Sequence, residues 1–174
     1  MLKLRILLFF VIAILSSCKR ILNCEEKEKY TFSKTTYSGN LLKTNGYFYN
    51  NTFSIIIIYL NGVLIDDTRS NYSNTLDIEN DMTSGTYYRK IKNDIYRWEI
   101  FYINNHQIKS EGFSSKSGIT CMYQVISTYE LINDSTLLLT NEINLDGSES
   151  KLKNDTFHFK QFSPKPDSTN SFIN

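Results

Sequence analysis

Hydrophobic and polar residues alternate with a period of two in short runs along the chain after residue 40. Segments rich in Asn, Asp, Gly and Ser separate the runs, which is the pattern of antiparallel strands joined by tight turns. We expect strands within residues 46–49, 53–60, 63–65, 86–91, 95–103, 107–109, 120–132, 136–143 and 156–162. The pattern therefore predicts about eight short strands in one β-domain.

Two neighbouring segments carry the clearest local signals. Asn61 and Gly62 form a turn pair in front of run 63–65, because both residue types tolerate a positive φ. Residues 55–58 are four consecutive isoleucines, apolar on both faces. Since β-branched residues fill this run and turns bound it closely, we interpret it as a central strand that is covered on both sides.

The run at residues 95–103 predicts a strand with one core face and one polar face. Arg97 and Glu99 are expected to point to water. The residues expected to face the core are Tyr96, Trp98, Ile100 and Tyr102. Run 86–91 is expected to pair with this strand as a hairpin. Residues 66–83 are polar and weakly patterned, which predicts a long loop or a short helical excursion.

The composition also favours an all-β fold. The chain has 174 residues, a length that suits a single domain, and its one alanine is Ala13, whereas it contains 12 tyrosines and 11 phenylalanines. Alanine is the best helix former, while aromatic residues fit a pleated surface. We expect an antiparallel meander that forms a closed or partly closed barrel or a sandwich, because both protect the sheet edges.

The charges exclude one class of partner. The formal net charge is +1, and the basic residues are scattered along the chain, so no basic field for nucleic acid is expected.

The N-terminus has the pattern of an export signal. Lys3 and Arg5 precede the apolar run 6–15, which is too short to span a bilayer as a helix. The following Leu15-Ser16-Ser17-Cys18 resembles the bacterial lipobox, in which an aliphatic residue and two small residues precede the cysteine that is lipidated. The chain is thus identified by its first 18 residues as similar to bacterial lipoproteins.

This resemblance implies that residues 1–17 are removed and that the Cys18 thiol carries a diacylglycerol, which attaches the protein to a membrane without a transmembrane span. Residues 18–40 are then the lipidated N-terminus and tether, since the all-charged run 25–29 offers nothing to bury. We expect the β-domain to span 41–163. The location implied is the cell envelope, specifically the outer membrane of a Gram-negative bacterium, and the membrane leaflet stays open.

The exported part has a second resemblance. A small exported β-meander looks like the lipocalin-like lipoproteins, and the segment 162–169, with both prolines of the chain, is similar to the tail of small Gram-negative lipoproteins. These families imply no reaction. We expect residues 164–174 to form an extended and exposed C-terminal tail.

The three cysteines leave one pairing open. With Cys18 lipidated, Cys24 and Cys121 remain as a pair in an oxidising compartment, where a disulfide would join the tether to the sheet. Alternatively, Cys121 is a small buried hydrophobic residue on the face of Tyr123, and Cys24 lies in the tether as a free thiol.

No catalytic or metal-binding motif is present in the sequence. The two histidines, His106 and His158, fit a turn and an outward strand position, and no Cys-x-x-Cys, phosphate loop or nucleophile elbow occurs. We expect no cofactor and no metal. A glycan-directed envelope hydrolase stays open as the alternative function, because carboxylates for glycosidic chemistry meet only in the fold.

The preferred function is therefore a non-enzymatic β-domain that binds a small hydrophobic or glycan ligand, or a partner, at the membrane. The candidate ligand-lining residues are Tyr96, Trp98, Tyr102 and Tyr123, because an aromatic side chain offers apolar area and, in tyrosine, a polar tip. The same aromatic residues also fit a plain β-core and its rim. A closed apolar cavity would favour binding, and a cleft with two facing carboxylates would favour hydrolysis. The oligomeric state is left open.

Overall fold

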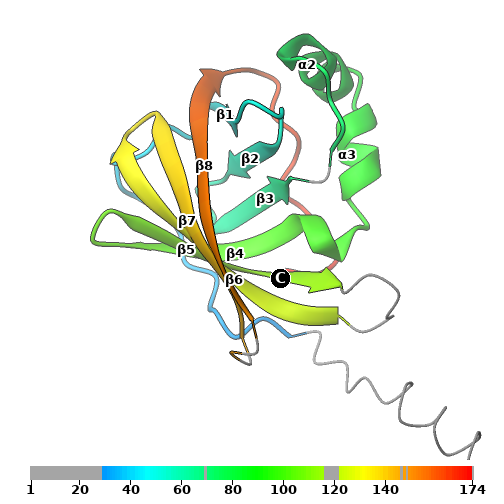
Figure 1. Cartoon of the computed structure of the whole chain (residues 1–174). Helices are drawn as coiled ribbons and strands as arrows, with labels where there is room; N and C mark the ends of the chain where they lie inside the picture. The colour runs from blue at the N-terminus through cyan, green and yellow to red at the C-terminus, as the bar shows by residue number, and fades with distance from the viewer. Residues whose placement is uncertain (1–28, 69, 116–121, 146, 148, 174) are drawn as a thin grey trace, which may run out of the picture. The chain divides into compact units, whose positions relative to one another are not determined.

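The computed structural model describes residues 29–68, 70–115, 122–145, 147 and 149–173. Its strands form a closed antiparallel barrel in which neighbours in sequence are neighbours in space and β1 pairs with β8 (Figure 1). The strands are β1 (Gly46–Tyr49), β2 (Ile55–Ile58), β3 (Val63–Asp67), β4 (Trp98–Asn104), β5 (Gln107–Ser115), β6 (Met122–Asn133), β7 (Thr136–Asn144) and β8 (Ser150–Gln161). The predicted all-β meander is confirmed, as a closed barrel of the lipocalin-like kind.

Tight turns account for much of this topology. Gly62 has a φ of 82° between β2 and β3, and a Cβ built there would lie 2.4 Å from the Thr35 carbonyl oxygen. Asn105 and His106 have φ values of 47° and 64° between the paired residues Asn104 and Gln107. Two central residues with positive φ match the right-handed strand twist of a two-residue hairpin. The predicted turn at Asn61-Gly62 is confirmed.

Two helices and a 3-10 turn connect β3 to β4: α2 (Thr75–Thr83), α3 (Thr86–Ile91) and η1 (Ile95–Arg97). The helical alternative for residues 66–83 is thus confirmed, and the Asn74 side chain caps α2 by accepting from the Asp77 N–H. The hairpin predicted at 86–91 is wrong. Tyr87 and Ile91 are one helical turn apart and both are buried, so a helix buries them together.

The barrel has two hydrophobic clusters, one on each side of its wall. Ile56 and Ile58 belong to the inner cluster and Ile55 and Ile57 to the outer one, so the interpretation of residues 55–58 as a strand covered on both sides is confirmed. The inner cluster also contains Leu42, Phe48, Leu64, Phe101, Ile108, Tyr129, Leu131, Leu137, Leu139 and Phe157. The outer cluster joins β1–β4 to α2, α3 and the C-terminal Ile173.

The face assignment predicted for residues 95–103 is confirmed for the burial of Trp98 and Ile100 in a hydrophobic core, but it is wrong for Glu99, which we expected to point to water. Trp98 and Ile100 belong to the outer cluster, whereas Glu99 lines the barrel interior and is only 8% exposed. Tyr102 lies on the outer face and is 36% exposed. Alternation defines two faces of a strand, but here the helices cover the outer face, so both faces are buried near the start of β4.

Both ends of the described chain pack on the barrel. The Glu111 carboxylate accepts hydrogen bonds from the backbone N–H groups of Thr31 and Phe32, so residues expected in the tether are attached. At the other end, Pro166 and Ile173 are buried and the Tyr59 hydroxyl donates to the Pro166 carbonyl over 2.8 Å. The C-terminal segment contains no helix or strand among its described residues, and Pro164 and Asp167 are exposed, as expected for an extended tail, but Pro166 and Ile173 are not.

The predictions for the signal segment 1–17, for Cys18 and for Cys24 concern residues that lie outside the described ranges, and so does the prediction for Cys121. Within the described ranges, no helix has the length and apolar character needed to cross a membrane.

Candidate functional site

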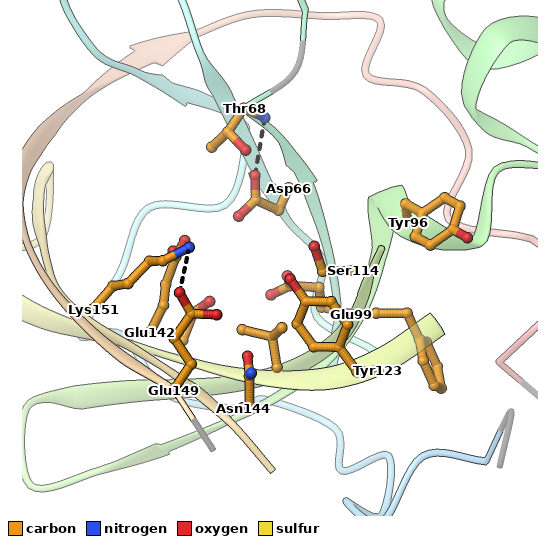
Figure 2. Close-up of a pocket in the computed structure, with 13 residues that line it drawn as sticks. Asp66, Thr68, Tyr96, Glu99, Ser114, Tyr123, Glu142, Asn144, Glu149 and Lys151 are labelled. Carbon is orange, nitrogen blue, oxygen red and sulfur yellow. Dashed lines mark hydrogen bonds and ion pairs between the residues drawn. The ribbon is translucent and has the colours of Figure 1, made fainter. Parts of the chain in front are cut away.

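A polar cavity of about 120 Å³ lies at one end of the barrel interior (Figure 2). Its lining comes from the ends of β3, β5 and β7 and the beginnings of β4, β6 and β8, which meet at the same end of an antiparallel barrel. The lining residues are Asp66, Thr68, Tyr96, Glu99, Phe113, Ser114, Tyr123, Val125, Ser127, Glu142, Asn144, Glu149 and Lys151. The cavity therefore continues the apolar inner cluster with a polar, acid-rich half.

Strand alternation places two of the acids in this cavity. On β3, Leu64 and Asp66 share the inner face, and on β4 the same holds for Glu99 and Phe101. Each strand thus contributes one apolar residue to the inner cluster and one carboxyl group to the cavity. Figure 2 shows Asp66, Glu99 and Glu142 around the same cavity on three different strands.

Asp66 is a buried carboxyl group with defined partners. It accepts hydrogen bonds from the Thr68 backbone N–H over 3.0 Å and from the Tyr129 hydroxyl over 3.2 Å. Burial raises the pKa of Asp66, the hydrogen bonds with Thr68 lower it in part, and the charge of Glu142 raises it further.

Glu99 is the least satisfied polar group of the cavity. Its Oε2 atom is buried and has no partner in hydrogen-bond geometry among the residues that the structure describes. The Ser110 hydroxyl, which likewise has no such partner, lies close enough to lower the pKa of Glu99 in part. Burial raises the pKa of Glu99 well above its usual range, and the charge of Asp66 adds to this effect. Gly112 makes room for this side chain, because a Cβ there would lie 2.7 Å from Glu99 Oε1.

The charged groups at the cavity rim are paired with each other. Lys153 Nζ lies 3.1 Å from Glu142, and Lys151 Nζ lies 3.1 Å from Glu149. Of the described lining residues, four are acidic and one is a lysine. The ion pairs thus leave the carboxyl groups of Asp66 and Glu99 without a cationic partner inside the cavity, although a buried carboxylate normally requires one.

The structure brings together two of the four predicted ligand-lining residues. Tyr96 and Tyr123 line the cavity. Trp98 does not, because it is fully buried on the outer face of β4, and Tyr102 lies on the outer surface with its ring 5.0 Å from that of Phe32. Both side chains leave the barrel wall on the side opposite to this cavity, and Tyr102 lines a pocket on the outer surface instead.

Sequence reasoning missed the acidic residues of the site. The available signal was an acid two positions from an apolar residue on the same strand face, as in Leu64-x-Asp66 and Glu99-x-Phe101. In the part of the chain that the structure describes, no three His, Cys, Asp or Glu side chains are grouped so that they could hold a metal ion.

Comparisons of the chain with models of protein families, with curated proteins and with solved structures gave no match. The chemistry of the site is therefore derived from its own residues. A buried carboxyl group with a raised pKa donates a hydrogen bond when protonated and binds a cation when ionised, and a pair of such groups also has the elements of acid–base catalysis.

Proposed function

We propose that the protein is a lipid-anchored β-barrel of the bacterial cell envelope that binds a small polar ligand in its acid-lined cavity. The attachment to the outer membrane is through the lipidated Cys18, in agreement with the lipobox-like residues 15–18. The observation that carries the binding function is the buried Glu99 carboxyl oxygen without a partner at the cavity wall. Buried polar groups are normally paired with protein, water or an ion, so this oxygen offers a hydrogen-bonding position to a group that enters the cavity.

The division of the barrel interior limits the class of ligand. Large apolar side chains of the inner cluster, including Phe48, Phe101 and Phe157, pack in one half of the barrel interior. The polar half offers about 120 Å³, whereas common small-molecule sites occupy about 300–1,000 Å³. We therefore favour a small polar molecule, or one polar end group of a larger one such as a glycan.

Native mass spectrometry of the full acylated protein, purified from its own envelope in detergent, tests this function. We expect a retained small molecule in the wild-type protein and in Glu130→Gln, whose carboxylate is exposed on β6. The molecule should be lost from Glu99→Gln. A wild-type protein that never carries an additional mass, even when prepared with envelope extract, would contradict ligand binding.

A glycan-directed hydrolase is the second candidate, and one observation favours it. Asp66 and Glu99 line the same cavity, and the charge of Asp66 raises the pKa of Glu99, as in acid–base pairs of glycosidases. The small volume argues against it, because the two sugars on either side of a scissile bond need more room than this cavity has. Release of a chromogenic phenol from aryl glycosides by the wild type, and its loss in Asp66→Asn, would support hydrolysis.

A further inference from the structure

We propose that the ligand of the barrel cavity is a short-chain primary amine, bound with its ammonium group against the Glu99 carboxylate. This inference rests on the proposed binding function and names the chemical class of the ligand. It starts from the composition of the cavity wall, which has four acidic residues and one lysine, and that lysine is already paired with Glu149.

The pairing of charges favours a cation over other ligands. An ammonium group has three N–H donors and no acceptor, so it complements a wall where carboxyl oxygens dominate. Glu99 Oε2 is free of hydrogen bonds from the described residues, and Asp66 lies in the same cavity. Lys151 is held by Glu149 at 3.1 Å and Lys153 by Glu142 at 3.1 Å. A ligand carboxylate or phosphate would therefore meet mainly acidic side chains.

The size and the walls of the cavity favour a short carbon chain. A cavity of about 120 Å³ is small for a ligand site, so a short molecule fits it better than a large one. Val125 and Phe113 provide apolar surface for methylene groups. Tyr96 and Tyr123 add aromatic rings to the lining, and the negative face of an aromatic ring attracts an ammonium group.

Binding of an amine at Glu99 must be linked to the release of a proton. Burial and the neighbouring acids raise the pKa of Glu99, so its carboxyl group is protonated before the cation arrives. The titratable or charged groups near it from the other elements include Tyr30 in the N-terminal segment, Asp66 on β3, Tyr96 in η1, Tyr123 and Tyr129 on β6, Glu142 on β7, and Glu149 and Lys151 at β8. The ammonium ion replaces the proton, so affinity should rise with pH.

Calorimetric titration of the full acylated protein in detergent tests the inference with three molecules of similar size: propylammonium, 1-propanol and propionate. Propylammonium should bind at least tenfold more tightly than the other two, and its affinity should increase with pH, by up to about tenfold per pH unit, until Glu99 is ionised in the empty protein. Titration in two buffers of different ionisation enthalpy should show close to one proton released for each amine bound. This readout needs no variant.

Two variants provide a second, independent test of amine binding at Glu99. Glu99→Gln should weaken propylammonium binding at least tenfold, whereas Glu130→Gln should leave it unchanged, with circular dichroism showing that both are folded. Binding of 1-propanol that is tighter than binding of propylammonium would contradict a cationic ligand, and so would a propylammonium affinity that falls as the pH rises. Either result would still agree with a site for a polar ligand. Failure of all three probes, with a molecule still retained in native mass spectrometry, would likewise reject the amine alone. Failure of both experiments would reject the proposed function as well.

Discussion

The indole Nε1–H of Trp98 donates a hydrogen bond of 2.9 Å to the backbone carbonyl of Ile91. The bond joins the first residue of β4 to the last residue of α3, and both side chains are buried in the outer cluster. Trp98 therefore holds the helical connection against the outside of the barrel wall and is separated from the cavity by that wall.

Truncation of this tryptophan should destabilise the fold without altering the cavity directly. We expect Trp98→Ala to lower the free energy of unfolding by about 3–5 kcal/mol, because a large buried side chain is removed. Trp98→Phe keeps much of the buried apolar area but loses this hydrogen bond. Because the Asp94 N–H still donates to the Ile91 carbonyl over 2.9 Å, we expect a loss of about 0.5–1.5 kcal/mol beyond the change in packing. Chemical denaturation measures both. The emission of this single tryptophan should be blue-shifted when folded, and water-like emission from a folded protein would contradict its burial.

Removal of Arg97 should be far more costly than a surface position would suggest. Its guanidinium pairs with the Asp67 carboxylate, whose side chain is 2% exposed, and its Nε lies 3.2 Å from Asp94. Arg97→Ala leaves the Asp67 charge buried and unpaired, so we expect a loss of about 3–5 kcal/mol in unfolding free energy. The double variant Arg97→Met with Asp67→Asn should recover much of this loss. A cost of about 0.5 kcal/mol for Arg97→Ala would instead indicate a solvated side chain.

The stability of the barrel should depend on pH through Lys165. Burial lowers the pKa of this lysine from an ordinary value of 10.5 to about 8, while its Nζ donates to the carbonyls of Thr44 and Ile58. Between these two pH values the folded protein has released the proton and the unfolded chain still holds it, so this group adds stability as pH rises. The difference in unfolding free energy between wild type and Lys165→Met should increase from pH 8 to 10.5. A difference that is constant over this window would show that the pKa is not lowered.

Glu111 should control the attachment of the N-terminal segment. Its carboxylate accepts from the backbone N–H of Phe32 over 2.6 Å and from Thr31. Glu111→Ala removes these acceptors, so we expect tryptic cleavage after the exposed Lys34 to become several-fold faster. Glu130→Gln is the control with an exposed carboxylate on the next strand, and it should be cleaved at the wild-type rate. Equal cleavage rates for Glu111→Ala and the wild type would argue against this attachment.

The lipid anchor predicted from residues 15–18 depends on one thiol. Cys18→Ser should abolish incorporation of a fatty-acid probe during metabolic labelling and move the protein from the membrane to the soluble fraction. Cys24→Ser is the matched control and should still be labelled. Continued labelling of the Cys18→Ser protein would contradict an anchor at this position.

The sequence by itself was sufficient for the strands and most turns, because these are decided by short-range rules. Asn61-Gly62 and the Asn104-to-Gln107 turn tolerate positive φ, and the isoleucines of β2 favour a pleated strand with two buried faces. The same local reasoning failed for α3, because we assigned residues 86–91 to a strand although Tyr87, Tyr88 and Ile91 have the spacing of a helix face. Packing of Tyr87 and Ile91 into the outer cluster favoured the helix.

Tertiary structure alone decided which strand face is inside and what the inside contains. Alternation along β4 separates Trp98 from Glu99 but does not say which of them enters a closed barrel, since both faces are covered. The sequence likewise does not predict that Asp66, Glu99 and Glu142 line one cavity. Their proximity depends on the register of strands that are up to about 75 residues apart in the chain. The cavity and its unpaired carboxyl group exist only once β1 and β8 have closed the sheet, which brings residues from distant parts of the chain around one space.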